Sequence, residues 1–316
     1  MDLYFLGTGA GMPSKGRNVT SIALRLAEER GTFWLFDCGE GTQHQVLNSP
    51  LKLGKLEYIF ITHLHGDHIF GLPGLLSSRS YQGGDTPLTL FGPPGIRTYL
   101  ETALTLSQTH LAYELKVQEI AGGIVFADDQ FEVTAAEVEH RIACFGYRVR
   151  ERDRPGKLDE ARLRADGVPA GPLYGRLKRG EDVALDDGRI VRGADYVGAP
   201  IAGRTVVIMG DTRRCTAAVE LARGADVLVH EATFAADLSP MAQQYYHTTS
   251  TGAAEVAAEA GAKALILTHI SSRYAGEEAE ALAAEARSVF PNTVVAYDHT
   301  VVSVPFGSEP SEEERE

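Results

Sequence analysis

The segment FITHLHGDH most constrains how this chain can fold, because it places three histidines and an aspartate within six positions after an apolar run. Side chains alternate along a strand, so His63 and His65 are expected to face the same way. The glycine that follows permits a sharp turn, which brings Asp67 and His68 back toward the first pair. Imidazole and carboxylate groups suit zinc and other first-row divalent ions. The spacing therefore predicts a metal site at the end of a strand.

Four ligands in tandem fit two adjacent metal sites better than one tetrahedral ion. Additional ligands are then required from elsewhere in the chain. His140 ends the apolar run FEVTAAEVEH, Asp211 ends TVVIMGD, and His269 ends KALILTH. A single residue of this kind is more often a surface or capping group, but three at equivalent strand ends favour one shared site.

The order of apolar periodicities predicts an α/β fold. Four strand-like runs, separated by Gly, Pro and Ser, lead up to the histidine cluster. Helices are predicted over residues 68–82, 93–108, 216–223, 250–260 and 277–290. WLFDCGEGTQHQVL followed by YIFITHLHGDH is faintly echoed by VVIMGDTRRCTAAVEL followed by VLVHEATFAAD. A two-fold sandwich with its chemistry at strand ends would produce such an echo.

The composition, 44% hydrophobic and 23% charged over 316 residues, is that of an ordinary globular protein. No run approaches the length of a membrane-spanning helix, so no membrane span is predicted. The start of the chain has an acid at Asp2 and no basic segment, so no signal peptide is expected. Cys38, Cys144 and Cys215 form no CxxC pair, which predicts buried free thiols in a reducing cytoplasm.

The net charge of −13 would repel nucleic acid overall, but it is distributed unevenly. Between Arg148 and Arg192, twelve Lys or Arg stand against nine Asp or Glu. Residues 150–193 also have weak periodicity and several glycines, which predicts an inserted arm rather than core. The tail at residues 308–316 is acidic and is expected to be solvated and disordered.

The HLHGDH motif and the three later strand-end residues together resemble the metallo-β-lactamase superfamily. The resemblance implies an αββα sandwich over residues 1–307 that binds two zinc ions, with manganese as a substitute. One ion would be held by His63, His65 and His140, and the other by Asp67, His68 and His269. Asp211 would bridge the two ions.

Members of this superfamily cleave lactams, thioesters, lactones and phosphodiesters, so the fold leaves the substrate open. Further motifs resemble the ribonuclease Z family, whose members remove the 3′ trailer from precursor tRNA. PSKGRN resembles its P-x-K-x-R-N loop, HEAT matches its motif of the same letters, and GVPAGPLYGRLK resembles its flexible tRNA-binding arm. The resemblance implies substrate contacts from Lys15, Arg17, Asn18, Gly171, Pro172, Arg176, Lys178 and Arg273.

The chemistry of these residues suits a nucleic acid. Lys15 offers phosphate a point charge and Arg17 offers it a planar fork. Without the family resemblance, the same residues could equally form an ordinary basic turn. In the arm, Arg176 and Lys178 suit backbone-phosphate contacts, which position RNA without reading its sequence. Composition alone would favour a solvated surface insertion.

The resemblance also implies that His247 lies near the scissile phosphate, held by Glu231 of the HEAT motif. A carboxylate that orients an imidazole and raises its basicity suits a general acid. Asp67 would orient or deprotonate the attacking water. Cleavage 3′ of the discriminator nucleotide would leave a 3′-hydroxyl on the tRNA and a 5′-phosphate on the trailer. A homodimer is implied as well, in which the arm of one subunit presents tRNA to the other.

Two other hypotheses are open from the sequence. A hydrolase of small molecules, such as a phosphodiesterase, lactonase or arylsulfatase-like enzyme, would share the zinc site and leave the arm unused. An RNA-binding protein with structural zinc is the other hypothesis. Structural zinc sites are normally closed by four protein ligands, which disfavours it.

Overall fold

The computed structural model describes residues 1–306, apart from the side chain of Glu277, and forms two compact units. The larger unit comprises Met1–Arg150 and Thr205–Pro305, and the smaller comprises Glu151–Arg204 with Phe306. The acidic tail predicted for residues 308–316 lies outside the described residues.

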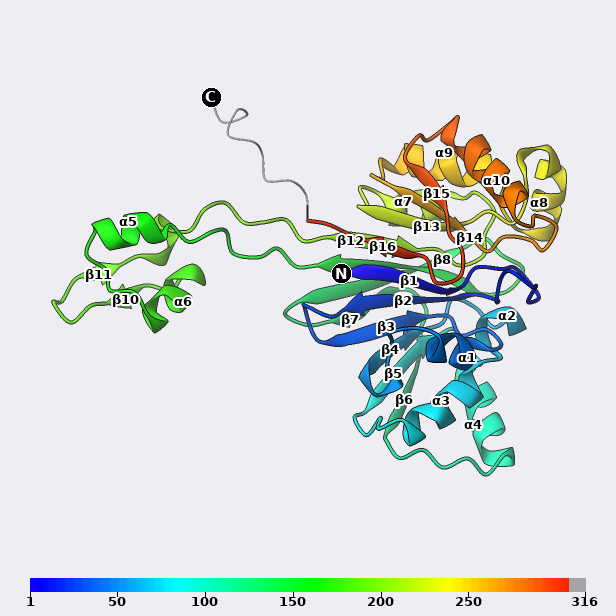
Figure 1. The fold of residues 1–316 in the computed structure, drawn as a ribbon, viewed down its shortest axis with the longest axis horizontal. Helices are drawn as coiled ribbons and strands as arrows, with labels where there is room; N and C mark the ends of the chain where they lie inside the picture. The colour runs from blue at the N-terminus through cyan, green and yellow to red at the C-terminus, as the bar shows by residue number, and fades with distance from the viewer. Residues whose placement is uncertain (307–316) are drawn as a thin grey trace. The chain divides into compact units, whose positions relative to one another are not determined.

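Two seven-stranded sheets form the centre of the larger unit (Figure 1). The strands of the first sheet are β1 (Asp2–Gly7), β2 (Ser21–Leu26), β3 (Thr32–Phe36), β4 (Leu56–Phe60), β5 (Leu88–Gly92), β6 (Leu115–Glu119) and β16 (Val301–Ser303). Their spatial order is β16-β1-β2-β3-β4-β5-β6. The strands of the second sheet are β7 (Gly123–Ala127), β8 (Phe131–Val138), β9 (Cys144–Glu151), β12 (Thr205–Ile208), β13 (Val227–Glu231), β14 (Leu265–Thr268) and β15 (Thr293–Val295). Their order is β15-β14-β13-β12-β9-β8-β7.

Helices cover the outer face of each sheet, so the predicted αββα sandwich is confirmed (Figure 1). The helices on the first sheet are α1 (Thr42–Leu47), α2 (Gly66–Ile69), α3 (Leu72–Tyr81) and α4 (Ile96–Leu106). Those packed on the second sheet are α7 (Thr216–Ala222), α9 (Ser250–Ala260) and α10 (Glu277–Arg287). The connections include α8 (Ser239–Tyr245) and the short 3-10 helices η1 (Leu53–Lys55) and η3 (Ala236–Leu238).

The side chains of β3 alternate between two core layers, one between the first sheet and its helices and one between the two sheets. Phe33 and Leu35 pack toward the helices, whereas Trp34 and Phe36 pack toward the second sheet. The Trp34 ring meets Phe131 of β8 edge-on, with ring centres 5.3 Å apart. Burying each such side chain contributes about 1.5–3 kcal/mol. The sheets are therefore a firm base for the loops at their ends.

Parallel strands place those loops on a common edge. β3, β4, β5 and β6 run parallel, and so do β12, β13, β14 and β15. The carboxyl ends of parallel strands lie together, which is where α/β proteins bind ligands. β5 and β6 were not predicted from the sequence, and both lie at the far side of the first sheet.

The helix predicted over residues 68–82 is interrupted, because the chain turns at Gly71 between α2 and α3. A Cβ on Gly71 would lie 2.1 Å from the Gly39 carbonyl oxygen, and one on Gly39 would lie 2.3 Å from the Asp67 carbonyl oxygen. Only glycine permits backbones to approach this closely. The two glycines thus hold the loop after β3 against the histidine-rich loop after β4.

The smaller unit has helices and a hairpin of its own, which weak sequence periodicity did not predict. Its elements are α5 (Glu160–Ala165), α6 (Pro172–Lys178), β10 (Val183–Ala184), β11 (Ile190–Val191) and the 3-10 helix η2 (Gly193–Asp195). They enclose a small apolar cluster of Leu163, Val168, Leu177, Val183 and Val191. At its chain ends, the buried Glu151 carboxylate pairs with Arg204 at 2.7 Å.

Two expectations about the chain as a whole can be compared with the structure. The three cysteines are free and buried, as predicted. Within residues 1–306, no helix has both the length and the apolar character needed to cross a membrane.

Candidate metal centre and substrate pocket

The predicted ligands converge where strands of both sheets end. His63 and His68 follow β4, His140 follows β8, Asp211 follows β12, and His269 comes directly after β14. His269 has a φ of 54°, a left-handed conformation that is uncommon for a residue with a side chain. Such backbone strain persists where surrounding contacts hold it, and it is frequent at functional sites.

One group of donor atoms comes from His63, His65, His140 and Asp211. The Nδ1 atom of His65 lies 3.0 Å from His63 Nε2 and 3.2 Å from His140 Nε2. Asp211 Oδ2 lies 3.6 Å from His63 Nε2. All four donors lie within 4.8 Å of one another, so a single ion could contact them all.

A second group comes from Asp67, His68 and His269. Asp67 Oδ2 lies 3.3 Å from His269 Nε2 and 3.5 Å from His68 Nε2, and the two ring nitrogens are 3.3 Å apart. Asp211 Oδ2 is 3.3 Å from His269 Nε2 and 3.5 Å from His68 Nε2. The same Asp211 oxygen therefore approaches both groups, as a bridging ligand must.

Outer oxygen atoms fix which nitrogen of each ring faces the centre. His140 Nδ1 donates to the Tyr246 carbonyl at 3.0 Å, and His68 Nδ1 donates to Asp37 Oδ2 at 2.8 Å. His269 Nδ1 is 2.9 Å from the Thr233 hydroxyl, which itself donates to a carboxylate and can therefore only accept from the ring. With Nδ1 protonated, each Nε2 turns a lone pair inward.

Asp37 is a residue of this site that the sequence analysis missed. Its Oδ2 accepts from His68 Nδ1 and from the Thr62 hydroxyl, both at 2.8 Å, while Oδ1 accepts the Thr62 amide at 2.8 Å. The Thr62 hydroxyl then accepts from His63 Nδ1 at 3.0 Å. One carboxylate thereby orients a ligand in each donor group. Its only sequence signal was its place directly after a strand, in LFDCG.

The charges of the centre suit a cation. Burial acts to raise the pKa of Asp211, but His269, His68 and His63 reverse this and hold the pKa well below its ordinary value. Burial acts to lower the pKa of His68, yet Asp211, Asp37 and Asp67 hold it well above its ordinary value. The buried carboxylates therefore favour a positive charge at the centre. Inward lone pairs beside buried carboxylates fit a divalent metal ion.

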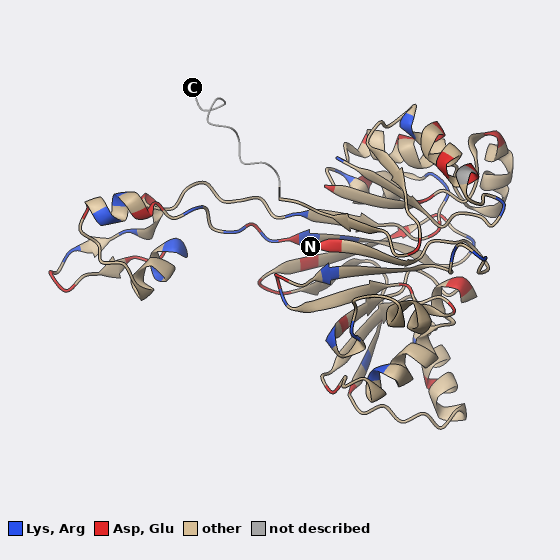
Figure 2. Cartoon of the chain, in the orientation of Figure 1, with Lys and Arg blue, Asp and Glu red and all other residues tan. Residues whose placement is uncertain are grey.

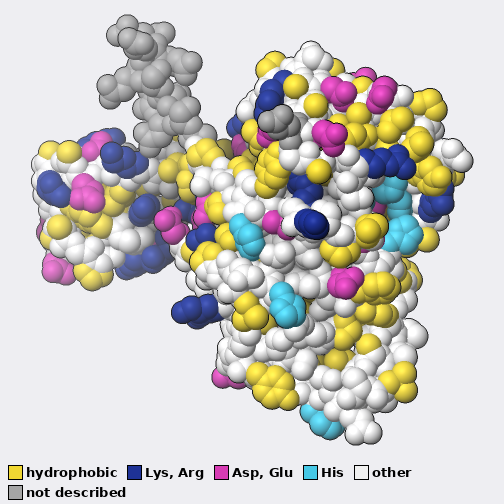
Figure 3. All heavy atoms as spheres, turned by 45° about the vertical axis from the view of Figure 1, so that its right-hand side comes forward, with side chains coloured by type: hydrophobic (Ala, Val, Ile, Leu, Met, Phe, Trp, Pro, Cys, Tyr) yellow, Lys and Arg dark blue, Asp and Glu magenta, His cyan; other side chains and the backbone are white. Residues whose placement is uncertain are grey.

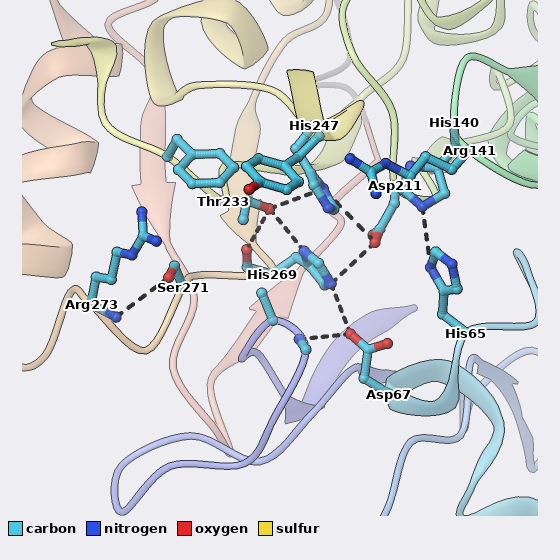
Figure 4. Close-up of a pocket in the computed structure, with 14 residues that line it drawn as sticks. His65, Asp67, His140, Arg141, Asp211, Thr233, His247, His269, Ser271 and Arg273 are labelled. Atoms are coloured by element: carbon cyan, nitrogen blue, oxygen red, sulfur yellow. Dashed lines mark hydrogen bonds and ion pairs between the residues drawn. The ribbon is translucent and has the colours of Figure 1, made fainter. Parts of the chain in front are cut away.

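His247 lies beside this cluster (Figure 4) and is held by the buried carboxylate of Glu231. Its Nδ1 is 2.9 Å from Glu231 Oε1, which also accepts the Thr212 amide at 2.8 Å. Glu231 Oε2 accepts the Thr233 hydroxyl at 2.6 Å. Burial lowers the pKa of His247, but Glu231 and Asp211 outweigh it and raise the pKa to about 9. The ring is therefore protonated at neutral pH in the protein alone.

A pocket of about 390 Å³ opens over the cluster. It is lined by Ala10, Gly11, His65, Asp67, His140, Arg141, Asp211, Thr233, Phe234, Tyr245, His247, His269, Ser271 and Arg273. Arg273 and Arg141 lie on opposite sides of the pocket, with His269 and Asp211 between them (Figure 4). On the surface of the larger unit, basic and histidine side chains adjoin one another (Figure 3). The pocket thus combines cations with a metal-binding floor.

The PSKGRN loop lines a separate pocket of about 370 Å³ and gives its residues different surroundings. Lys15 is exposed. Arg17 is only 6% exposed, and its guanidinium donates to the Thr8 hydroxyl and the Ala296 carbonyl, both at 2.6 Å. The side-chain amide of Asn18 donates from Nδ2 to the Glu40 carbonyl at 2.9 Å. Arg17 and Asn18 therefore hold the loop in shape, which the sequence did not indicate.

The predicted arm residues lie together in the smaller unit, where basic and acidic residues alternate (Figure 2). Gly171 precedes α6 and Pro172 is its first residue. Arg176 and Lys178 are exposed in the last turn, and Arg176 Nε donates to Glu181 at 2.9 Å. Lys178 lines a cavity of about 870 Å³ within this unit.

Comparison with protein families gives two matches, each over part of the chain. Residues 1–147 match the model described as Anti-Pycsar protein Apyc1. Residues 183–270 match the Beta-lactamase superfamily domain.

Comparison with curated proteins gives matches over nearly the full chain. Ribonuclease Z of Geobacillus kaustophilus is 59% identical over 307 residues, which cover 97% of this chain and 100% of that protein. Ribonuclease Z of Bacillus subtilis is 57% identical, with the same two coverages.

Solved structures agree with these relatives. The short form of human tRNase Z matches with a TM-score of 0.70 and 32% identity, covering 97% of this chain and 100% of that one. The metallo-β-lactamase fold protein YhfI of Bacillus subtilis matches with a TM-score of 0.67 at 19% identity, which speaks for the fold alone.

Proposed function

The chain belongs to the ribonuclease Z family, and we propose that it is a metal-dependent endoribonuclease that removes the 3′ trailer from precursor tRNA. The observation that carries the proposal is the paired His/Asp cluster with the His247–Glu231 pair beside it in one pocket. The cut falls 3′ of the discriminator nucleotide. It leaves a 3′-hydroxyl on the tRNA and a 5′-phosphate on the trailer.

The centre would hold two zinc ions, or manganese in their place. His63, His65 and His140 would hold one ion, and Asp67, His68 and His269 would hold the other, with Asp211 shared between the two sets. The supporting observation is that every histidine with an outer oxygen partner turns its other nitrogen inward. When bound, the ions lower the pKa of a water and neutralise charge on the phosphate oxygens.

Asp67 orients the attacking water and accepts its proton. The Gly11 amide donates at 2.7 Å to Asp67 Oδ2, the same oxygen that His269 and His68 approach, and so helps to fix the carboxylate. A fixed acceptor is what general-base catalysis requires. Attack on phosphorus then breaks the bond to the 3′ oxygen of the discriminator nucleotide.

His247 protonates that departing 3′ oxygen. Glu231 raises the pKa of the ring and occupies Nδ1, so that Nε2 is the nitrogen that faces the substrate to donate. Glu231 itself is completely buried and well supplied with donors. A carboxylate so held orients the ring without taking part in proton transfer itself.

Other residues bind the RNA. Lys15 contacts phosphate from its exposed position, whereas Arg17 and Asn18 act by shaping the loop that carries it. Arg273, which lines the pocket, contacts the RNA near the scissile bond. In the arm, Arg176 and Lys178 contact the phosphate backbone beside the turn at Gly171 and Pro172, and such contacts suit an enzyme that acts on many tRNAs.

Family membership also leads us to propose a homodimer, in which the arm of one subunit presents tRNA to the active site of the other. Light scattering on the purified protein would measure its mass. The proposed substrate, precursor tRNA, and the buried free thiols both support a cytoplasmic location.

Removal of the smaller unit, which contains the predicted arm, tests the proposed function. Arg150 and Thr205 are neighbours on the antiparallel pair β9 and β12, so a short turn can replace residues 151–204. We expect this variant to lose cleavage of precursor tRNA and to keep hydrolysis of bis(p-nitrophenyl) phosphate. If the intact protein hydrolysed the small phosphodiester but never cut precursor tRNA, the small-molecule hydrolase would replace our proposal.

A further inference from the structure

Two residues that line the pocket, Arg141 and Tyr245, have no part in the mechanism above. Arg141 directly follows the ligand His140, and Tyr245 ends α8. The Arg141 guanidinium lies 5.0 Å from the centre of the Tyr245 ring, and Arg141 also donates to the Gln244 carbonyl at 3.2 Å. The two form an Arg–aromatic pair at the mouth of the pocket.

This pair is exposed, which distinguishes it from the other Arg–aromatic pair of the pocket. Tyr245 is 43% exposed, whereas Phe234, which lies under Arg273 on the other side, is 6% exposed. The Phe234 ring can therefore support Arg273 but offers little of its face to a ligand. Tyr245 and Arg141 both present surface to the pocket.

The pair is also fixed relative to the reacting groups. His140 Nδ1 donates to the Tyr246 carbonyl, so the segment after α8 is tied to a ligand. Tyr246 has a φ of 60°. This conformation is held by a hydrogen bond at the helix end, in which the His247 amide donates to the Ala242 carbonyl at 2.9 Å. The strained residue turns the chain so that Tyr245 and His247, on either side of it, both line the pocket.

We propose that Arg141 and Tyr245 form a stacking platform for a base next to the scissile phosphate, an inference that rests on the proposed function. Every base has a face that stacks on an aromatic ring or a guanidinium plane, whatever its hydrogen-bonding edge. The platform therefore accepts any unpaired base and requires that it be unstacked from its neighbour. The enzyme gains a preference for single-stranded RNA at the cut without a preference for its sequence.

The test combines variants of Tyr245 with precursors that lack one base. Single-turnover cleavage is measured with Tyr245→Leu, which removes the ring, and Tyr245→Phe, which keeps it. Tyr81→Leu is the matched control, because Tyr81 is 87% exposed and lies at the end of α3, outside the pocket. The substrates are an intact precursor, one abasic at the discriminator and one abasic at the first trailer nucleotide.

We expect Tyr245→Leu to lower kcat/KM on the intact precursor by about tenfold or more, as loss of one stacked base does. Tyr245→Phe and Tyr81→Leu should keep most of the wild-type rate. On one of the two abasic precursors the wild type should slow similarly, and Tyr245→Leu should slow it no further. An equal effect of Tyr245→Leu on all three substrates would overturn the platform.

The stacking role of Arg141 is tested separately, with one variant that keeps the positive charge and one that removes it. Arg141→Lys keeps the positive charge and loses the plane, so it should be as slow as Arg141→Ala on the intact precursor. Full rescue by lysine would overturn the stacking role of Arg141. If the wild type failed to cut the intact precursor at all, the proposed function itself would fall, which distinguishes that failure from a failure of the platform.

Discussion

Replacing Asp37 by asparagine should weaken metal binding in both donor groups. The carboxylate accepts from His68 directly and from His63 through the Thr62 hydroxyl. Asparagine has the same shape and tolerates the φ of 58° at this position, so the backbone should persist. Its NH2 group, however, cannot accept from His68 Nδ1 or from the Thr62 hydroxyl.

The expected loss of metal affinity follows from those contacts. An amide that donates to the Thr62 hydroxyl lets that hydroxyl donate to His63 Nδ1, which moves the ring hydrogen to Nε2 and points it into the centre. His68 loses the acceptor that kept its own Nε2 free. Loss of such an outer partner lowers metal affinity by about 10–100-fold. That factor equals about 1.4–2.7 kcal/mol per ion.

The assay is a zinc competition titration of the metal-free protein against a coloured chelator of known affinity. Asp226→Asn is the matched control, since Asp226 accepts the Thr205 amide at 2.6 Å and the Lys263 ammonium at 2.7 Å, outside the donor groups. We expect weaker zinc binding in Asp37→Asn alone. Wild-type zinc affinity in a folded Asp37→Asn protein would refute the role given to this carboxylate.

Three further outcomes are expected. His247→Ala should lower single-turnover cleavage by about 10²–10⁴-fold while filter binding of the RNA is kept, and a parallel loss of binding would contradict its role as acid. Lys178→Ala should reduce the salt slope of tRNA binding by about one, and an unchanged slope would exclude a phosphate contact. Glu151→Gln should expose the smaller unit to proteases, because removing one partner of the buried pair with Arg204 costs about 3–5 kcal/mol. Burial acts to raise the pKa of Glu151, but Arg204 and Arg154 lower it, so this stabilisation is present above the ordinary carboxyl pKa and is lost as pH falls through the lowered one. Equal cleavage of variant and wild type across that pH range would contradict this account.

The seven residues predicted as ligands lie together in the structure because each follows an apolar strand, and strand ends of one type lie at one edge. His140, Asp211 and His269 are far apart in the chain, yet the sandwich brings them together. The outer carboxylate Asp37 and its partner Thr62 were missed because contacts between loops have no spacing in sequence. They depend on the close backbone approach that glycines permit.

Other differences have equally local causes. Lys15 and Arg17 look alike in sequence, but packing leaves one exposed and buries the other over Tyr297, with 4.5 Å between its guanidinium and the ring. The elements of the smaller unit are short and have few apolar residues, so no periodicity develops. Its core of five buried residues becomes visible only once the chain is folded.

The most direct test of the central claim is cleavage of an end-labelled precursor tRNA with a 3′ trailer by zinc-loaded protein, at two salt concentrations, with both product ends mapped. We predict one cut after the discriminator, leaving a 3′-hydroxyl and a 5′-phosphate, slowed by salt and abolished by a chelator. Intact precursor alongside continued hydrolysis of a small phosphodiester would contradict the account.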